Sequence, residues 1–427
     1  MKTRKPPIAL ALSLMLASPL AAQADTDLKA EVERLKAQNR EILERLDATA
    51  ELLESGRAGQ PVGTTEAGPH DHAMPTTGSM RQRTFGIHGR TGSTLIGGYG
   101  EMHYNNLEQK DSGSPKSDKK AMDFHRFILF MGHEFSERIR FWSELEVEHA
   151  YLNDNNDGSG DTAPGEVSVE QAFLEFDLND NTSARAGILL IPVGFINETH
   201  EPPTFYGVER NNVAKNIIPT TWREGGAGLT GRFGQGFSYD LLVHTGLKTS
   251  GSSNYAVRKG RTGVGAAPAD NLAVTARLNW VGMPGLLVGG AVQRQTDITQ
   301  GTDANAGAAT LLSGHFSWQT GPFQLLGVYA TWSLDGSGPA TAGADRQTGW
   351  YVEPSWKVTP KFGVFARYST WDNQVNSGTD TAYSQRDIGF NYWPHENVVL
   401  KFDYQDQSTP TGSAEYDGIN LGVGYMF

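Results

Sequence analysis

The chain contains no cysteine among its 427 residues. This absence excludes disulfide bonds, thiol catalysis and cysteine-ligated zinc. Long hydrophobic runs are also missing. After residue 24, no stretch approaches the ~18–20 apolar residues of a membrane-spanning helix. Only 38% of the residues are hydrophobic, 50 are glycine, and the mean hydropathy is −0.42. By hydropathy alone, the chain resembles a polar, acidic protein.

Positive charge is in deficit, with 36 Lys and Arg against 48 Asp and Glu and a formal net charge of −12. This balance argues against nucleic acid as a partner, because such binding needs a basic surface. Two common catalytic motifs are absent as well, the Gly-x-Ser-x-Gly elbow and His-Glu-x-x-His. We therefore expect no enzymatic activity and no cofactor.

The first 84 residues divide into three segments by composition. A basic start, an apolar run and a small-residue end predict a secretory signal peptide over residues 1–24. Heptad spacing of Leu, Ile and Val over residues 25–54, with Asn39 in the seam, predicts a short coiled coil. We expect it to form a homotrimer, although a single amphipathic helix lying on another surface also fits. Residues 55–84, rich in Gly, Pro, Thr and Ser, predict a flexible linker.

The last twelve residues carry the clearest secondary-structure signal, because Ile419, Leu421, Val423, Tyr425 and Phe427 alternate with small or polar residues. Side chains alternate across a strand, so one face is apolar and the other is small or polar. A terminal strand of this kind is typical of outer-membrane barrels. The same period recurs and predicts sixteen strands, near residues 93–105, 122–134, 138–150, 167–178, 183–191, 223–232, 237–246, 271–281, 286–297, 309–319, 323–334, 347–358, 361–372, 384–393, 398–406 and 416–427.

The connections alternate between tight turns, such as Ser136-Glu137, and long polar segments, such as Pro192–Trp222. Short periplasmic turns and long external loops are the outer-membrane layout. The predicted fold is all-β, a 16-stranded antiparallel transmembrane β-barrel over residues 85–427 with a short α-helical coiled coil on its periplasmic side. We expect the protein in the bacterial outer membrane, in contact with lipid and lipopolysaccharide. A soluble protein with two stacked sheets is the structural alternative.

The longest loop and its flanks carry a motif. The strand from Ala186 ends in Gly187-Ile-Leu-Leu-Ile-Pro-Val-Gly194, and the returning strand up to Arg232 is rich in Gly and Arg. This resembles the phosphate-selective porin O and P family. The resemblance implies a trimeric, 16-stranded channel that is constricted by its third external loop, residues 192–222, and is often anion-preferring.

A barrel of sixteen strands holds water unless a loop enters it. By alternation, its inward positions carry both basic and acidic side chains, which departs from a strongly basic anion pore. Two interpretations stay open, a salt-bridged polar wall and an anion path along arginines. The pore-lining candidates are Arg126, Arg138, Arg140, Arg185, Arg232, Arg277, Arg367, Lys401, Glu144 and Glu146, and those of the constriction loop are Glu198, Glu201, Glu209, Arg210 and Lys215.

The function expected from these features is passive diffusion of small polar or anionic solutes, phosphate included, through the lumen. The alternative is a structural or adhesive barrel that is plugged and tethered by its coiled coil. No metal site is assigned. His70, His72 and His88 stand in or near the linker, and the acidic segment 153–161 is followed by Pro164 where an EF-hand needs glutamate.

Overall fold

The computed structural model describes residues 92–110, 117–150 and 165–427. The expected signal peptide, coiled coil and linker lie outside the described residues, as do His70, His72, His88 and the acidic segment 153–161. In the described part of the chain, no helix combines the length and apolar character needed to cross a membrane.

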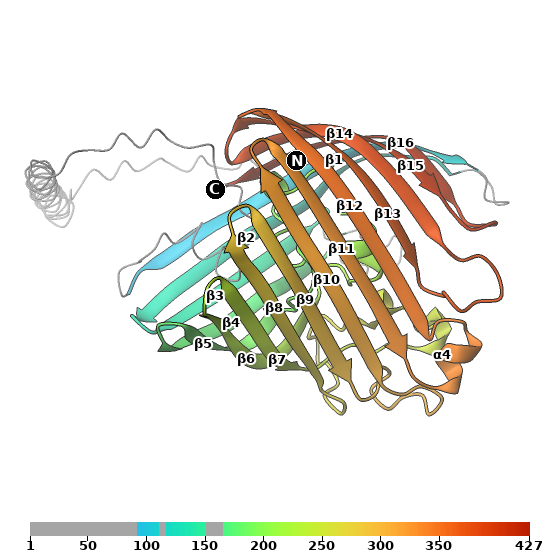
Figure 1. The fold of residues 1–427 in the computed structure, drawn as a ribbon, viewed down its shortest axis with the longest axis horizontal. Helices are drawn as coiled ribbons and strands as arrows, with labels where there is room; N and C mark the ends of the chain where they lie inside the picture. The colour runs from blue at the N-terminus through green and yellow to red at the C-terminus, as the bar shows by residue number, and fades with distance from the viewer. Residues whose placement is uncertain (1–91, 111–116, 151–164) are drawn as a thin grey trace, which may run out of the picture. The chain divides into compact units, whose positions relative to one another are not determined.

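Sixteen antiparallel strands form one closed barrel, in which each strand pairs with its sequence neighbours and β1 pairs with β16 (Figure 1). This confirms the predicted barrel and its strand number. The strands are β1 (Thr94–Lys110), β2 (Lys119–Ser136), β3 (Ile139–Glu148), β4 (Val167–Asn179), β5 (Thr182–Leu190), β6 (Arg223–Phe233), β7 (Phe237–His244), β8 (Ala273–Met283), β9 (Leu286–Gln295), β10 (Ala309–Thr320), β11 (Phe323–Leu334), β12 (Arg346–Thr359), β13 (Phe362–Asp372), β14 (Tyr383–His395), β15 (Val398–Ser408) and β16 (Glu415–Met426).

The chain ends close the barrel. β16 runs antiparallel to β1 from Lys110↔Glu415 to Tyr99↔Met426. Beyond the strand, Phe427 and Gly98 exchange two backbone hydrogen bonds of 2.9 Å each. The terminal phenylalanine is therefore held by main-chain pairing, and its ring, 59% exposed, stays on the outer surface beside Phe127.

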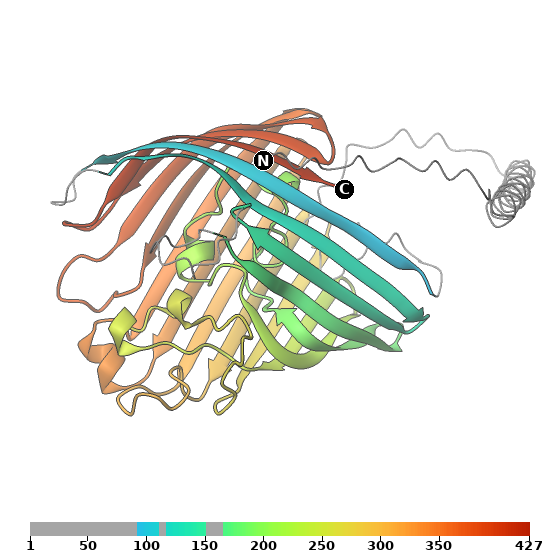
Figure 2. The ribbon, with the colours of Figure 1, turned by 180° about the vertical axis from the view of Figure 1, so that it is seen from behind.

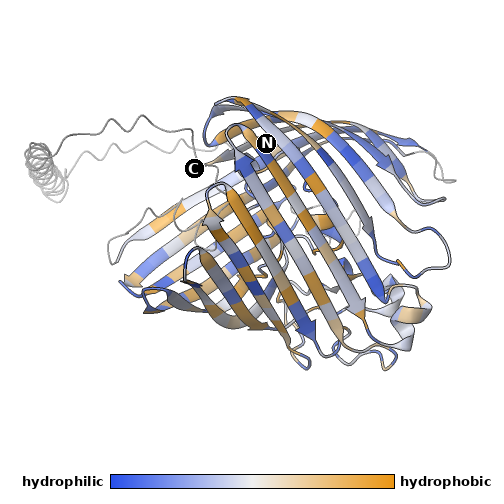
Figure 3. Ribbon diagram, in the orientation of Figure 1, coloured by the Kyte–Doolittle hydropathy of each residue, from blue (hydrophilic) through white to orange (hydrophobic). Residues whose placement is uncertain are grey.

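The two faces of the wall differ as the two-residue period predicts. Outward side chains are apolar and exposed, among them Leu241, Leu278, Leu312 and Leu400. Alternating bands of hydrophobic and hydrophilic residues follow the strands (Figure 3). Inward positions hold many buried polar groups. The polarity is thus that of a barrel in lipid, with a polar interior.

Tight turns and long connections alternate around the barrel. The β2–β3 turn has two residues, whereas residues 191–222 (loop L3) and 245–272 (loop L4) are long. L3 contains η2 (Pro202–Thr204) and α3 (Val213–Asn216), and L4 contains η3 (Gly251–Ser253) and η4 (Val257–Gly260). A short helix, α4 (Ser337–Thr341), lies among the long loops, at the opposite end from the carboxyl terminus (Figure 1).

The predicted strands match the observed ones in number and order. The largest difference is at the end of β1, predicted at Asn105 and observed at Lys110. There the strand continues with polar residues, and Lys110 pairs with Asp417 of β16. Hydrophobic alternation ends where the wall leaves the lipid. Backbone pairing does not depend on this alternation, so the strand continues beyond it.

Candidate functional site

Loop L3 connects β5 to β6 and runs through the interior of the barrel (Figure 2). Most of its side chains from Ile191 to Trp222 are buried or half-buried, although it carries only two short helical turns. A loop without regular pairing must satisfy its backbone polar groups in another way. Here the barrel wall supplies the partners.

Inward side chains from β2 and β14–β15 hold the main chain of L3. Arg126 donates to the His200 carbonyl oxygen at 2.9 Å, and Lys401 donates to the Gly207 carbonyl oxygen at 2.9 Å. Asn391 donates to the Phe205 carbonyl oxygen at 2.9 Å, while the Val208 amide donates to Asp403 at 2.6 Å. β2 lies on one side of the β1–β16 pair, and β14 and β15 lie on the other. The first half of L3 is therefore held on both sides of the junction between the first and last strands.

Apolar contacts hold the second half of L3 against the opposite wall. Ile217 and Trp222 belong to a buried cluster with inward residues of β10–β13 and with L4. Trp332 Nε1 also donates to the Ile217 carbonyl oxygen at 2.9 Å. Sorting inward positions by charge missed these residues. In the sequence, they could have been found from strands that carry apolar side chains on both faces. β10 does so at Leu311 and Leu312, and β11 does so at Val328, Tyr329, Ala330 and Trp332.

Most of the predicted basic lining is paired with carboxylates. Five arginines of the wall form ion pairs: Arg126 with Glu101, Arg140 with Glu175 and Asp177, Arg185 with Glu175, Arg277 with Asp240 and Glu198, and Arg367 with Glu353 and Asp387. Arg138 lies exposed in the β2–β3 turn, and Arg232 is exposed near the end of β6. These pairs favour the salt-bridged wall over an anion path along these arginines.

The predicted loop residues separate into different environments. Glu198 contacts Arg277, and Glu209 lies 3.1 Å from the Nδ1 atom of His103 on β1. Glu201 is buried. Arg210 donates to the Thr221 hydroxyl at 2.9 Å. Of the predicted wall glutamates, Glu144 is fully buried and Glu146 nearly so.

A cavity of about 550 Å³ lies between L3, L4 and strands β1–β4. Six basic residues that line it are called the cationic patch. Among the described residues, none of them forms an ion pair with a carboxylate. They are Arg210 and Lys215 of L3, Arg223 of β6, and Arg258, Lys259 and Arg261 of L4. Five carboxylates line the same cavity. Glu101 is paired with Arg126 and Glu209 lies beside His103, whereas Glu146, Glu148 and Glu166 form the rest of the acidic lining. Of the six members, only Arg210 and Lys215 were predicted from the sequence.

Burial is the main cause that lowers the pKa values of Arg210, Lys215, Arg258 and Arg261 in the patch, and neighbouring positive charges add to it for all of these except Arg258. Burial lowers the pKa of Lys215, and the charges of Arg258, Lys119 and Arg210 lower it further, against the opposing effect of Glu209. A bound anion would stabilise the protonated, positively charged forms of these groups, because a nearby opposite charge raises their pKa values.

Two groups of side chains have the types and spacing of metal ligands. Asp123, His125 and His149 lie at the outer end of β2 and β3, half-buried. Glu144, Glu170 and His200 lie inside the barrel, where β3 and β4 meet L3. Burial lowers the pKa of His200 to about 4, so the imidazole is neutral near pH 7.

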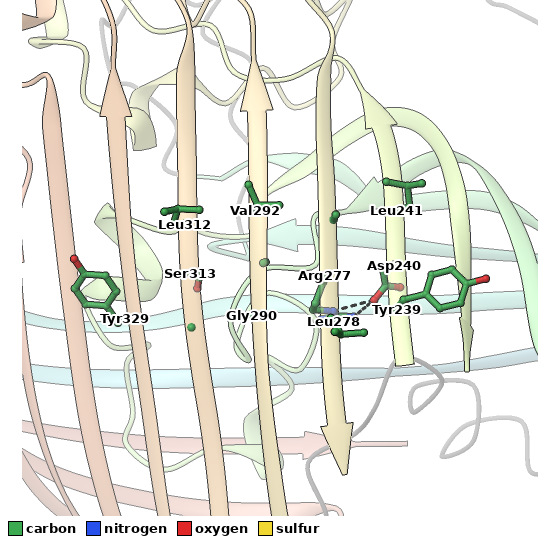
Figure 4. Close-up of a pocket in the computed structure, with 13 residues that line it drawn as sticks. Tyr239, Asp240, Leu241, Arg277, Leu278, Gly290, Val292, Leu312, Ser313 and Tyr329 are labelled. Atoms are coloured by element: carbon green, nitrogen blue, oxygen red, sulfur yellow. Dashed lines mark hydrogen bonds and ion pairs between the residues drawn. The ribbon is translucent and has the colours of Figure 1, made fainter. Parts of the chain in front are cut away.

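The outer wall has a shallow depression of about 600 Å³ on β7–β11, where Gly290 and Gly314 leave space among larger side chains. Leu241, Val292 and Leu312 line it, and the Arg277–Asp240 ion pair links the neighbouring strands there (Figure 4). Because the apolar lining belongs to the outward face, the depression is distinct from the lumen.

A closed barrel with an apolar outer face, a polar interior and an inward loop defines an outer-membrane porin, a channel protein. The model of the family described as phosphate-selective porin O and P matches residues 96–427. An uncharacterized protein of Aquifex aeolicus (strain VF5) is 34% identical over 341 residues, which cover 72% of this chain and 74% of the relative. The chain belongs to the phosphate-selective porin O and P family, as its loop motif predicted.

Solved structures share the fold at low sequence identity. The outer membrane channel DcaP of Acinetobacter baumannii matches with a TM-score of 0.53 and 12% identity, over 79% of this chain and 98% of that chain. An anion-selective porin from Comamonas acidovorans matches with a TM-score of 0.53 and 12% identity, over 78% and 99% of the two chains. OmpF of Salmonella typhi, in complex with daunomycin, matches with a TM-score of 0.53 and 14% identity, over 80% and 99%.

Proposed function

We propose that the barrel is a passive diffusion channel for small polar and anionic solutes, phosphate among them. The observation that carries the proposal is the cationic patch, in which six basic side chains without carboxylate partners in the described chain line one cavity. Guanidinium and ammonium groups are good partners for phosphate and other oxyanions. The neighbouring porin from Comamonas acidovorans is described as anion-selective, which agrees with this preference.

Loop L3 narrows the path in this proposal. It carries Arg210 and Lys215 into the lumen and packs its apolar half against one side of the wall. A solute would pass between the patch and the carboxylates Glu146, Glu148 and Glu166. Selectivity then depends on the width of this passage and on the charges that line it. Arg126, Arg277 and Arg367 hold the loop. The ion-paired arginines of the wall contribute little net charge.

The test measures reversal potential in planar bilayers under a tenfold KCl gradient. The full chain should be anion-selective, and the double variant Arg258→Gln/Arg261→Gln should move the reversal potential toward the cation value. Arg138→Gln/Lys361→Gln is the matched control, because it removes the same charge near the turns. An equal shift in both double variants would remove the patch from the path, and folded protein without conductance would defeat the channel itself.

We further propose a homotrimer, embedded in lipid and lipopolysaccharide, whose coiled coil lies in the periplasm after removal of the signal peptide. The heptad spacing over residues 25–54 supports the trimer. The family and fold favour a channel without catalytic activity. A plugged structural or adhesive barrel is less well supported, because the cavity beside L3 is large and lined by charged groups.

A further inference from the structure

Three side chains form a compact, buried group where L3 meets β3 and β4. Glu144 of β3, Glu170 of β4 and His200 of L3 are each 0% exposed, and they offer ligand atoms that all lie within 4.8 Å of one another. One oxygen of each glutamate, Oε1, is buried and has no hydrogen-bond partner. Their other oxygens are used: Glu144 Oε2 accepts from Gln171 at 2.6 Å, and Glu170 Oε2 lies 3.4 Å from His200 Nε2. Unpartnered carboxylate oxygens inside a protein are costly.

A break in strand pairing places these groups together. The register between β3 and β4 shifts after Glu144↔Gln171, so that Leu145 pairs with Val169 and Glu170 is the extra residue. Both Glu170 and Gln171 are consequently buried, although neighbouring residues of a regular strand point to opposite faces. Bulges re-aim side chains in this way, and they are common beside functional sites.

The imidazole of His200 is oriented as a metal ligand would be. Its Nδ1 atom lies 3.2 Å from the Asn197 carbonyl oxygen, which can only accept a hydrogen bond. A neutral ring that donates from Nδ1 to this carbonyl oxygen presents the lone pair of Nε2 toward Glu170, which lies 3.4 Å away. Metal-binding histidines commonly donate their second ring nitrogen to a carbonyl or carboxylate, which fixes the tautomer.

The spacing fits a small divalent ion. Zinc lies roughly 2.1 Å from imidazole nitrogen and carboxylate oxygen, so two of its tetrahedral ligand atoms are about 3.4 Å apart. The distance between His200 Nε2 and Glu170 Oε2 is 3.4 Å. An imidazole with two carboxylates suits zinc and related transition ions better than calcium, which takes six to eight oxygens.

We infer that Glu144, Glu170 and His200 form a binding site for a divalent transition-metal ion, which joins loop L3 to the wall at β3 and β4. Glu146, two residues from Glu144 on β3, lines the charged cavity, so the group lies close to it. Arg126 is already paired with Glu101 at 2.6 Å. It therefore cannot by itself balance the negative charge of Glu144 and Glu170. The site does not depend on which solutes the channel carries.

The experiment uses the folded full chain in detergent, stripped with chelator, incubated with Zn²⁺ and desalted. Zinc per chain is then measured by elemental analysis. The second group, Asp123, His125 and His149, is removed in every sample by His125→Asn/His149→Asn. In this background we expect one zinc per chain, and Glu170→Gln or His200→Asn should abolish it or weaken the affinity at least tenfold. Glu224→Gln is the control, because Glu224 is equally buried but bonds to Trp222 and Thr245 outside the group.

A second measurement needs no change at the site. Cobalt substituted into the background protein should give the visible absorption of a four- or five-coordinate ion with nitrogen and oxygen ligands. Zinc should also slow proteolysis within L3. The inference is overturned if the background protein retains no metal, if zinc survives both Glu170→Gln and His200→Asn, or if bound cobalt has the spectrum of the hexa-aqua ion.

Discussion

The Lys401 ammonium group of β15 donates a 2.9 Å hydrogen bond to the Gly207 carbonyl oxygen of L3, and it lies 3.5 Å from the centroid of the Phe205 ring. This one side chain thus contacts both the backbone and an aromatic ring of the loop. We predict that Lys401→Met leaves a buried carbonyl without a donor, at a cost of about 1–3 kcal/mol. L3 should then leave its docked position more often, seen as larger and noisier single-channel conductance.

The control for this prediction is Lys361→Met. Lys361 also donates to a carbonyl oxygen, that of Pro394 at 3.1 Å, but it is exposed in a turn and does not contact L3. Its conductance trace should match that of the unmodified protein. Identical traces for Lys401→Met and the unmodified protein would mean that the other wall contacts suffice to hold the loop.

A second prediction concerns backbone strain at Gly187 in β5, which has a φ of 141°. A Cβ atom there would lie 2.1 Å from the Ala172 carbonyl oxygen of β4. Gly187→Ala should destabilise the barrel by about 1–3 kcal/mol, because neither the angle nor the space suits a side chain. The measurement is the urea midpoint in lipid vesicles. Gly314→Ala is the control, since no atom lies within 4 Å of its Cβ position, and an equal loss there would refute the explanation.

A third prediction concerns the lipid face at Leu312, which is 54% exposed on β10. Leu312→Arg places a charge among outward apolar residues and should reduce folding stability in bilayers, by as much as about 2–4 kcal/mol, which is the cost at the membrane midplane. Leu312→Ile, which keeps the face apolar, should stay close to the unmodified protein. Equal stability of both variants in vesicles would show that this part of the wall does not contact lipid.

A fourth prediction is a pH dependence at Glu209. Burial opposes its ionisation, but the hydrogen bond and positive charge of His103 lower its pKa well below the ordinary value. A carboxylate with a depressed pKa stabilises the docked loop above its ordinary pKa of about 4.3, and loses this contribution as the pH falls through the depressed value. Conductance should change between pH 4 and pH 2 in the unmodified protein. Glu209→Gln should lack this step, and its persistence there would assign the step to another group.

The strands were predictable because a barrel in lipid imposes one chemical rule on every second residue. Ile419 to Phe427 show it clearly, and β3 and β8 repeat it with the same period. L3 was recognisable from its length and its Pro192–Gly194 exit. These features depend on local sequence alone, so no knowledge of which strands pair was required.

The partners of individual charges were not predictable in the same way. Arg140 lies opposite Glu175 only because β3 and β4 pair in that register. One bulge, at Glu170, then changes which side chains face inward. No sequence period marks the basic residues of L4, because a loop has no regular alternation of faces. Only the course of L4 brings Arg258, Lys259 and Arg261 to the cavity that Arg210 also lines.

Loop L3 also bears on how the barrel is held closed. Its first half meets β2 through Arg126 and β15 through Lys401, and a Cβ atom at Gly424 of β16 would lie 2.2 Å from Pro202. L3 therefore bridges the junction of the first and last strands from inside the barrel. Loosening the loop should weaken the closure of the barrel, and opening that junction should release the loop.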